Sequence, residues 1–220
     1  MNRFDVDLVL FDLDGTLADT APDLIAAVNR VRQTLALPPV PSEQVRPVVS
    51  KGARAMLHAG IPERPEAQLD LLERFLAFYG ERGNVETRLY DGVAGLLEAL
   101  EAIRRPWGIV TNKPGYLTQP LLVALGLDRR ASVVVSGDTL PVKKPDPAPV
   151  RHACDVLGVA PARAVLVGDD RRYVESALAA GAGAIVAAWG YIEAGDDPAR
   201  WGGGAIAATP AELAGLLGLS

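Results

Sequence analysis

Five short apolar runs recur along the chain, and each is followed by turn residues and a helical pattern. They cover residues 7–11, 107–111, 132–136, 164–168 and 183–187. Apolarity within each run is continuous rather than alternating, which is typical of strands buried on both faces of a parallel sheet. This order of strands and helices predicts an α/β fold, with a parallel sheet covered by helices on both faces.

Three of the helical patterns are clear enough to assign a first and a last residue. Apolar residues at helical spacing predict helices over 93–104 and 117–125, and a third helix over 149–157 follows the turn at Pro145-Asp146-Pro147. Each of them separates two of the apolar runs. The pattern therefore fits crossover connections between parallel strands.

One long interval interrupts this alternation. From about residue 21 to residue 87 there is no strand pattern, and we expect an all-α insertion there, with the α/β core formed by residues 1–20 and 88–220. One face of an inserted helix is predicted from residues at helical spacing: Leu69, Leu72, Leu76 and Tyr79. An insertion that follows the first strand leaves at the carboxyl edge of the sheet. It can fold over the crevice where such sheets bind ligands.

Composition narrows the classes of function. The 220 residues are 49% hydrophobic, enough for a sizeable core, and the net charge of -5 argues against broad binding to nucleic acid or anionic membranes. Cys154 is the only cysteine, which excludes an intrachain disulfide and a Cys-rich zinc site. The longest uncharged run, 176–192, is short for a membrane span. We expect a soluble cytoplasmic protein, a monomer or a homodimer, that binds a small molecule.

Two acids follow the first apolar run, in the stretch FDLDGTL. Side chains in a strand alternate between faces, so Asp12 and Asp14 point the same way if the strand continues to its tip. Two adjacent carboxylates repel each other and normally need a cation or a shared proton. The stretch therefore predicts a site with a positive partner.

Other chemically active residues follow the later strands. Thr111-Asn112-Lys113 ends the second run, Lys143-Lys144 follows the third, and Asp169-Asp170 follows the fourth. The carboxyl ends of parallel strands lie along one edge of a sheet, so these groups are expected to converge. A hard divalent cation such as Mg²⁺ would offset the repulsion among the acids. A threonine hydroxyl and a lysine ammonium suit a phosphate group.

These stretches have a family resemblance. FDLDGTL, TNK, KKPDP and VGDD, in this order and spacing, resemble the four motifs of the haloacid dehalogenase superfamily over essentially the whole chain. The resemblance implies a Rossmann-like core, and the insertion over 21–87 resembles the small α-helical cap of the first type (C1). It also implies a Mg²⁺-dependent phosphomonoester hydrolase.

The resemblance assigns roles to the two acids of the first motif. Asp12 is expected to be the nucleophile that attacks phosphorus and forms an aspartyl-phosphate. Asp14 is expected to protonate the leaving oxygen and then to deprotonate the hydrolytic water. The dehalogenases and the phosphonate-cleaving members lack an acid at that place, so Asp14 favours phosphate-ester chemistry.

The resemblance also implies a metal site and a phosphate site. Mg²⁺ would be held by the carboxylates of Asp12 and Asp169 and by the backbone carbonyl of Asp14. Thr111, Asn112 and Lys144 would bind the phosphoryl group of the substrate, with Lys144 also shielding the charge of the nucleophile. Taken alone, Thr111 is equally suited to capping the helix that follows it. Lys143 is interpreted as a solvated neighbour.

The fourth motif departs from the family pattern. Its last position is usually an acid that holds a metal-bound water, and here it is Tyr173. Asp170 is a candidate to support the metal in its place, or it is only the N-cap of the next helix. Two alternatives to hydrolysis stay open: a phosphosugar mutase using the same intermediate and, because of Tyr173, a phosphosugar-binding protein with weakened turnover.

Substrate information lies in two further stretches. SKGARAM (50–56) and AWGYIEAGDDPARWG (188–202) resemble phosphoglycolate phosphatases and, within that set, N-acetylmuramic acid 6-phosphate phosphatases. Both substrates carry a carboxylate, so a cation from the insertion is expected to bind it. Lys51 and Arg54 are the candidates, since Arg offers a bidentate fork. Lysine and arginine are also common on protein surfaces that bind no ligand.

Overall fold

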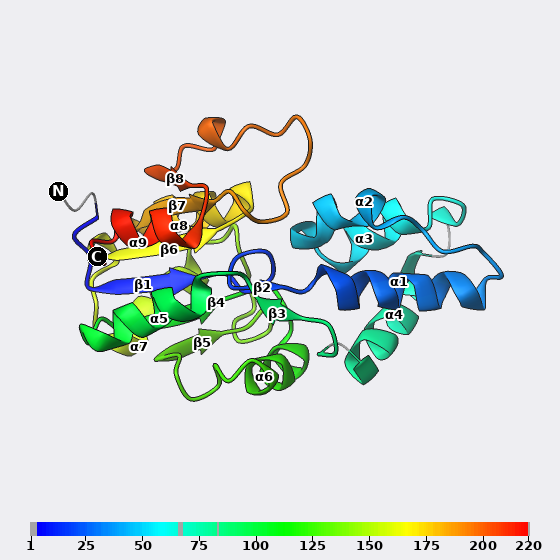
Figure 1. Ribbon diagram of the computed structural model, residues 1–220, viewed down its shortest axis with the longest axis horizontal. Helices are drawn as coiled ribbons and strands as arrows, with labels where there is room; N and C mark the ends of the chain where they lie inside the picture. The colour runs from blue at the N-terminus through cyan, green and yellow to red at the C-terminus, as the bar shows by residue number, and fades with distance from the viewer. Residues whose placement is uncertain (1–3, 66–67, 83, 220) are drawn as a thin grey trace.

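A six-stranded parallel sheet forms the centre of the protein, seen in a computed structural model that describes residues 4–65, 68–82 and 84–219 (Figure 1). Each strand pairs in parallel with its neighbours. In sheet order the strands are Val133–Val135 (β5), Trp107–Val110 (β4), Leu8–Phe11 (β1), Ala164–Gly168 (β6), Gly183–Ala187 (β7) and Ala205–Ala207 (β8).

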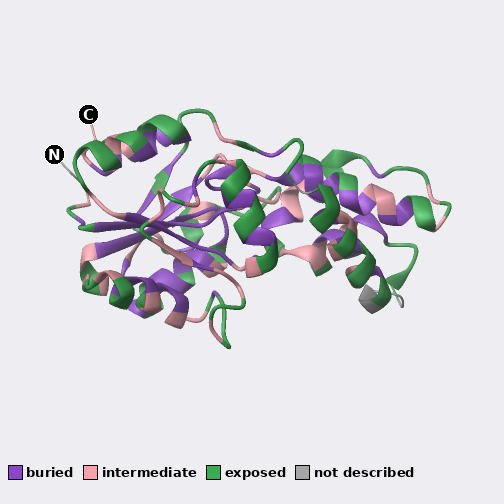
Figure 2. Ribbon diagram, turned by 90° about the horizontal axis from the view of Figure 1, so that it is seen from below, coloured by how far each residue is buried: buried purple, intermediate pink, exposed green. Residues whose placement is uncertain are grey.

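Helices cover both faces of this sheet, which confirms the predicted α/β class. One face packs against Val93–Ala102 (α5), Gly115–Ala124 (α6) and Pro210–Leu216 (α9). The other packs against Ala148–Leu157 (α7) and Arg171–Ala180 (α8). Short 3₁₀ turns occupy Pro161–Arg163 (η3) and Pro198–Arg200 (η4). The three central strands β4, β1 and β6 are buried throughout, whereas the edge strands β5 and β8 are partly exposed (Figure 2).

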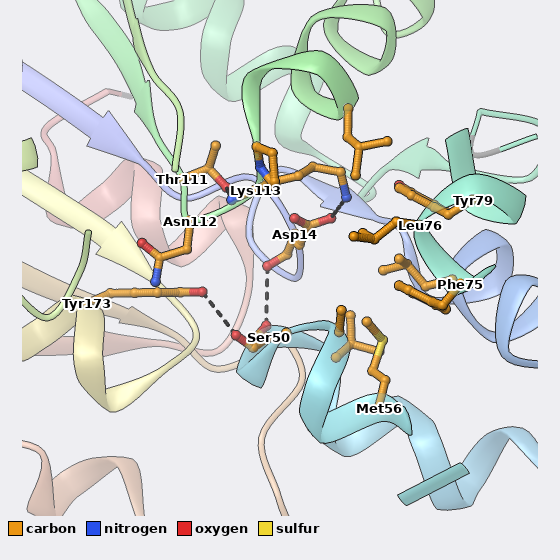
Figure 3. A pocket seen from close by; sticks show the side chains of 16 residues that line it. Asp14, Ser50, Met56, Phe75, Leu76, Tyr79, Thr111, Asn112, Lys113 and Tyr173 are labelled. Atoms are coloured by element: carbon orange, nitrogen blue, oxygen red, sulfur yellow. Dashed lines mark hydrogen bonds and ion pairs between the residues drawn. The ribbon is translucent and has the colours of Figure 1, made fainter. Parts of the chain in front are cut away.

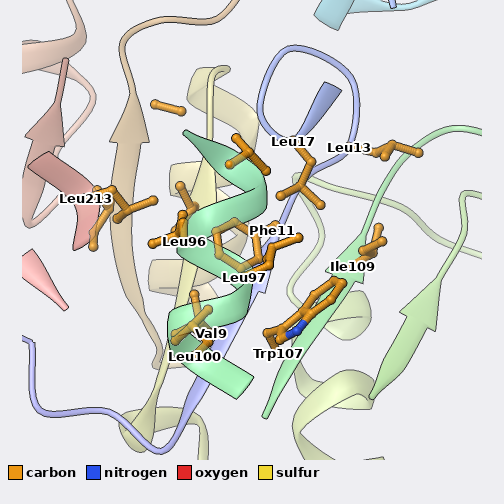
Figure 4. Close-up of a cluster of buried hydrophobic side chains, with 14 of the residues drawn as sticks. Val9, Phe11, Leu13, Leu17, Leu96, Leu97, Leu100, Trp107, Ile109 and Leu213 are labelled. Atoms are coloured by element: carbon orange, nitrogen blue, oxygen red, sulfur yellow. The ribbon is translucent and has the colours of Figure 1, made fainter. Parts of the chain in front are cut away.

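Alternation along β1 divides the core into two clusters. Val9 and Phe11 face the α5 side, while Leu8 and Leu10 face the α7 and α8 side. The ring of Phe11 meets the ring of Trp107 edge-on, with centroids 6.4 Å apart, beside the leucines of α5 (Figure 4). Because both faces bury apolar side chains, the carboxyl end of β1 is held firmly within the sheet.

All five predicted strands are present, each within the predicted run, and the three bounded helices differ from prediction by two residues or fewer at each end. Three strands were not predicted. They are Ala18–Asp19 (β2), Arg88–Leu89 (β3) and β8. These strands have two or three residues, too few to produce a recognisable apolar run.

A separate group of helices lies at one end of the sheet (Figure 1). This helical unit, residues 21–82, has its own buried apolar cluster, which also includes Leu117 and Tyr191 from outside it. Its elements are Ala21–Thr34 (α1), Ser42–Val45 (α2), the 3₁₀ helix Arg46–Lys51 (η1), Ala53–Gly60 (α3) and Gln68–Arg82 (α4).

The buried face of α4 is rotated from the predicted one. Leu71, Phe75 and Tyr79 are buried, and the rings of Phe75 and Tyr79 stack 6.3 Å apart. Of the predicted face, Tyr79 is buried, Leu72 and Leu76 are only partly buried, and the side chain of Leu69 lies outside the described residues. The helix carries apolar residues on two adjacent stripes, so spacing alone did not identify the one that faces the cluster.

A two-stranded antiparallel ladder joins the helical unit to the sheet. Ala18 pairs with Leu89 and Asp19 with Arg88, so the chain enters and leaves the unit through adjacent strands. Among the helices that the structure describes, none is long and apolar enough to cross a lipid bilayer.

Candidate active site

Asp12 directly follows β1 and is buried. Its Oδ1 accepts a hydrogen bond of 2.6 Å from the Lys144 ammonium, whereas its Oδ2 has no hydrogen-bond partner among the described residues. Burial raises the pKa of Asp12, and the positive charge of Lys144 acts in the opposite direction. A buried carboxylate oxygen without a partner is costly unless a ligand completes it. This atom is therefore suited to act on a substrate or a metal ion.

Lys144 is fully buried and holds Asp12 from the loop that follows β5. Its ammonium also donates to the carbonyl of Val110 and lies 3.6 Å from the centroid of the Tyr173 ring. Burial lowers the pKa of Lys144, and the attraction of Asp12 opposes that change. The ammonium therefore has fixed partners on several sides and can hold Asp12 in one orientation.

Asp14 has different partners, because β1 ends at Phe11 and the chain then turns through Gly15, whose φ is +81°. Asp14 Oδ1 accepts a hydrogen bond from Lys113 Nζ at 2.9 Å (Figure 3). It accepts a second one from Thr20 Oγ1 at 2.6 Å. The two acids of the first motif are thus each paired with a different lysine. We expected the two side chains to face the same way only if the strand continued to Asp14, and it ends at Phe11.

Lys113 is a site residue that the sequence analysis did not single out. It is buried, pairs with Asp14, and lies 4.5 Å from the centroid of the Tyr79 ring in α4. Burial acts to lower the pKa of Lys113, but the charge of Asp14 and the interactions with Tyr79 together raise that pKa. The only available sequence signal was its place in the TNK stretch, two residues after Thr111.

Asp169 follows β6 and is buried beside the loop after β1. Its Oδ2 accepts from Ser50 Oγ at 2.7 Å and from the Tyr191 backbone N–H at 2.8 Å, and Thr16 Oγ1 lies 3.4 Å from its Oδ1. Burial, followed by the charge of Asp12, raises the pKa of Asp169 to about 7. The carboxylate would be stabilised by an added positive charge.

Two glycines allow the backbone to close around Asp169. A Cβ at Gly15 would lie 2.0 Å from Asp169 Oδ2, and a Cβ at Gly190 would lie 2.3 Å from Asp169 Cβ. Neither position has room for a side chain. The close approach keeps the Asp14 carbonyl and the Asp169 carboxylate in one small region.

These groups form a donor set suited to magnesium. Asp12 and Asp169 supply carboxylate oxygens, and the Ser50 hydroxyl, which donates to Asp169, lies 3.3 Å from the backbone oxygen of Asp14. Among residues 4–65, 68–82 and 84–219, no cluster of three or more His, Cys, Asp or Glu could hold a metal ion. Two carboxylates and one carbonyl are nevertheless hard oxygen ligands of the kind Mg²⁺ uses alongside water.

Thr111 and Asn112 lie beside Lys144 at the end of β4. Thr111 Oγ1 accepts from the Lys113 backbone N–H at 3.2 Å, and Asn112 Nδ2 donates to the Lys144 carbonyl at 2.9 Å. Asn112 Oδ1 is buried and has no partner among the described residues. The hydroxyl and the amide therefore keep hydrogen-bonding capacity next to the two acids.

Neither Asp170 nor Tyr173 offers a free carboxylate beside Asp169. Asp170 caps α8, accepting from the Arg172 backbone N–H at 2.9 Å, and it also pairs with the Arg172 side chain at 2.8 Å. Tyr173 is buried, and its O–H donates to the Ser50 carbonyl at 3.3 Å. Burial raises the pKa of Tyr173 well above 10, so it remains a neutral phenol.

The helical unit brings three polar residues to this region. Ser50 contacts both Asp169 and Asp14, although the sequence analysis did not name it as a site residue. Lys51 is paired with Glu193, so its charge is already compensated. Arg54 is exposed in the first turn of α3.

A cavity of about 110 Å³ lies between Asp14 and the helical unit (Figure 3). Thr111, Asn112, Lys113 and Tyr173 line its polar side. Its other side is mainly apolar and includes Leu24, Val49, Met56, Phe75, Leu76 and Leu117. The structure thus brings Asp14, Thr111 and Asn112 to one cavity, with Asp12 and Lys144 paired just beneath Tyr173.

Comparison with known proteins agrees with this geometry. Residues 9–187 match the model of the haloacid dehalogenase-like hydrolase family. An N-acetylmuramic acid 6-phosphate phosphatase of Pseudomonas aeruginosa is 43% identical over 220 residues, which cover 99% of this chain and 97% of that protein. A phosphoglycolate phosphatase of Xanthomonas campestris pv. campestris is 44% identical over 206 residues, which cover 93% of each chain.

A solved structure extends the likeness to three dimensions. The crystal structure of a predicted phosphoglycolate phosphatase from Haemophilus somnus superimposes with a TM-score of 0.85 at 30% identity, covering 98% of this chain and 99% of that one. The sequence resemblance to this superfamily is therefore confirmed. The chain belongs to the haloacid dehalogenase-like hydrolases, and the two relatives described above are phosphatases.

Proposed function

We propose that this protein is a Mg²⁺-dependent phosphomonoesterase that works through an aspartyl-phosphate on Asp12. The observation that carries the proposal is the buried Asp12 carboxylate, with Oδ1 fixed by Lys144 and Oδ2 left without a partner. A nucleophile needs one oxygen held in place and the other free of competing hydrogen bonds. Asp14, two residues later, supplies the group that moves protons.

In the first half-reaction, Asp12 Oδ2 forms a bond to phosphorus as the bond from phosphorus to the ester oxygen breaks. Asp14, protonated at this stage, gives its proton to the departing alkoxide. Lys144 stays hydrogen-bonded to Oδ1 and offsets the charge that gathers around phosphorus. Thr111 and Asn112 are placed to hydrogen-bond the phosphoryl oxygens.

In the second half-reaction, water attacks the phosphorus of the aspartyl-phosphate. Asp14, now ionised, takes a proton from that water, and Asp12 leaves as a carboxylate together with inorganic phosphate. Mg²⁺ held by Asp12, Asp169 and the Asp14 carbonyl would supply the positive charge that lets anionic phosphate approach these acids. Both half-reactions use the same proton carrier.

We also propose that residues 21–87 act as a cap over a core formed by residues 1–20 and 88–220. The β2–β3 ladder supports this division, because both connections run through adjacent strands. Ser50 and Tyr79 lie in the insertion, and they contact Asp169 and Lys113 of the core. The cap would exclude water from the phosphoryl group during the first half-reaction.

For the substrate we propose a small acidic phosphate ester, either N-acetylmuramic acid 6-phosphate or 2-phosphoglycolate. Support comes from the names of the two relatives at 43% and 44% identity. A panel of phosphorylated sugars and sugar acids, scored by phosphate release, tests the assignment. If another ester is hydrolysed far more efficiently than both candidates, the substrate assignment is wrong.

The hydrolase proposal is tested with an aryl phosphate, Mg²⁺ and the variant Asp12→Asn. We expect phosphate release to fall by about 10³-fold or more, because an amide oxygen is a poor nucleophile. Asp128→Asn, an acid outside the site, is the control and should retain full activity. Wild-type release no faster than that of Asp12→Asn would reject the proposal.

Tyr173 supports the second candidate, a phosphosugar-binding protein with weakened turnover. The position supplies a neutral phenol rather than the carboxylate usual in the family. Under this alternative, Tyr173→Asp gains phosphatase activity over the wild type. Under the hydrolase proposal the wild type already hydrolyses phosphate esters. If that hydrolysis needs no sugar bisphosphate as activator, a mutase is excluded.

A further inference from the structure

A basic groove adjoins the catalytic cavity. It has a volume of about 360 Å³ and is lined by both the helical unit and the α/β core. Of the described residues that line it, none is acidic and four are cationic: Lys51, Arg54, Lys143 and Arg172. The whole chain has a net charge of -5, so this gathering of positive charge is opposite in sign to the molecule that carries it.

Two of the four cations are already compensated. Lys51 pairs with Glu193, and Arg172 pairs with Asp170. The side chains of Arg54 and Lys143 form no ion pair or hydrogen bond with any part of the chain that the structure describes. The groove therefore presents two unpaired cations that can bind an anionic group of a ligand.

The position of Arg54 on its helix further favours the binding of an anion. Arg54 lies in the first turn of α3, which has no acidic residue in that turn. A cation at a helix N-terminus is repelled by the positive end of the helix dipole, so the arrangement is unfavourable unless an anion is bound nearby. Lys143 adds its charge from the core side, next to the catalytic Lys144.

The described residues that line the catalytic cavity include no unpaired cation of this kind. Lys113 is the only cation among its lining residues, and it is paired with Asp14. Most of the remaining surface, contributed by the helical unit, is apolar. A second anionic group on the substrate would be poorly matched within the cavity. The groove, which shares Ser50, Gly52 and Asn112 with the cavity, can accept it.

We propose that Arg54 and Lys143 bind a carboxylate of the substrate that lies several bonds from the phosphoryl group. The inference rests on the proposed function and narrows it to phosphate esters of sugar-sized acids. In 2-phosphoglycolate a single carbon separates the carboxylate from the ester oxygen, so its carboxylate stays in the cavity. In N-acetylmuramic acid 6-phosphate a sugar ring separates the two anionic groups.

The test compares two substrates that differ only in the carboxylate arm. N-acetylmuramic acid 6-phosphate carries a lactyl group where N-acetylglucosamine 6-phosphate has a hydroxyl. We expect wild-type kcat/KM to favour the acid by at least about tenfold. Arg54→Met and Lys143→Met should each lower kcat/KM for the acid by about tenfold while changing it less than twofold for the sugar phosphate without a carboxylate.

The double variant Arg54→Met with Lys143→Met should remove the preference. Arg129→Met, an exposed cation between α6 and β5 and outside the groove, is the matched control and should keep it. Because the substituted side chains are exposed, the thermal unfolding midpoint should be unchanged. Equal losses on both sugars, no loss on either, or a selective loss on 2-phosphoglycolate would each overturn the inference.

Hydrolysis of p-nitrophenyl phosphate separates this inference from the proposed function. If the wild type and the groove variants hydrolyse that ester equally but show no preference for the acidic sugar, only the groove assignment fails. If the wild type hydrolyses none of the esters, the proposed function fails as well. Added salt should weaken the preference, because exposed charges are screened.

Discussion

The hydroxyl of Ser50 lies 2.7 Å from Asp169 Oδ2 and 3.3 Å from the backbone oxygen of Asp14. Ser50 belongs to η1 in the helical unit, whereas both oxygens belong to the core. One side chain of the insertion thus connects two of the oxygens that we propose as metal ligands. We therefore expect the position of the helical unit and the binding of Mg²⁺ to be coupled.

Ser50→Ala tests this coupling. Removing the hydroxyl leaves Asp169 Oδ2 with the Tyr191 backbone N–H as its remaining donor, so an added cation should be bound more tightly. We expect the Mg²⁺ dissociation constant, measured by calorimetry, to fall by about fivefold, and the metal-free protein to lose about 1 kcal/mol of stability. Weaker Mg²⁺ binding would instead identify the hydroxyl as a metal ligand.

Lys144→Met should destabilise the protein and abolish turnover. Removing the ammonium leaves Asp12 buried without its charge partner, which costs about 3–5 kcal/mol when the partner stays ionised. Urea denaturation measures the loss. The double variant Asp12→Asn with Lys144→Met should lose less than the sum of the single variants. Additive losses would show that the two side chains do not stabilise each other.

Lys113→Met should affect the proton transfer more than the attack on phosphorus. Lys113 holds the Asp14 carboxylate at 2.9 Å, and Asp14 is proposed to protonate the leaving oxygen. Alkyl esters need that proton, whereas p-nitrophenolate leaves without it. We expect kcat to fall about 10²-fold on an alkyl phosphate and less than tenfold on p-nitrophenyl phosphate.

Asp14→Asn serves as the reference for Lys113→Met, since it should give the same selective pattern. Equal losses of kcat on the two esters would indicate that Lys113 binds the phosphoryl group instead. A rise in KM without a change in kcat would point to uniform substrate binding.

Cys154 gives a pH-dependent prediction outside the site. Burial, with a smaller contribution from Asp155, raises the pKa of its thiol to about 11. The native thiol should therefore resist an aromatic disulfide reagent at pH 8 and react at once after unfolding in urea. Rapid reaction of the native protein would contradict the burial of Cys154.

The sign of the associated stability effect follows from the same shift. The native state holds the proton of Cys154 more tightly than the unfolded state does. Its contribution to stability is fully present below about pH 9 and is lost as the pH rises through about 11. Cys154→Ala should flatten the fall in unfolding free energy across that interval, as measured by urea denaturation.

Local sequence patterns predicted the sheet and several of the residues that the structure brings together. Runs such as 164–168 are apolar throughout because both faces are covered, and this property is visible in the sequence. Asp12 and Lys144 could be placed because ordered motifs mark the strand ends. Their roles in catalysis remain predictions.

Contacts between distant segments could not be predicted in the same way. Ser50 and Asp169 are 119 residues apart, and nothing in the spacing of η1 indicates that its serine reaches the sheet. The same is true of Lys51, a candidate for substrate binding whose charge is instead compensated by Glu193. Such contacts depend on how the helical unit packs on the core, where Leu117 and Tyr191 join the apolar cluster of that unit.

The β2–β3 ladder has a consequence for how proteins of this architecture can diverge. Ala18 pairs with Leu89, so the outgoing and returning segments meet at a single point of attachment. Changes of length beyond that point leave the connections between the strands of the sheet unaltered. We therefore expect the insertion to diverge faster than the sheet in length and sequence, except at residues such as Ser50 that contact the core.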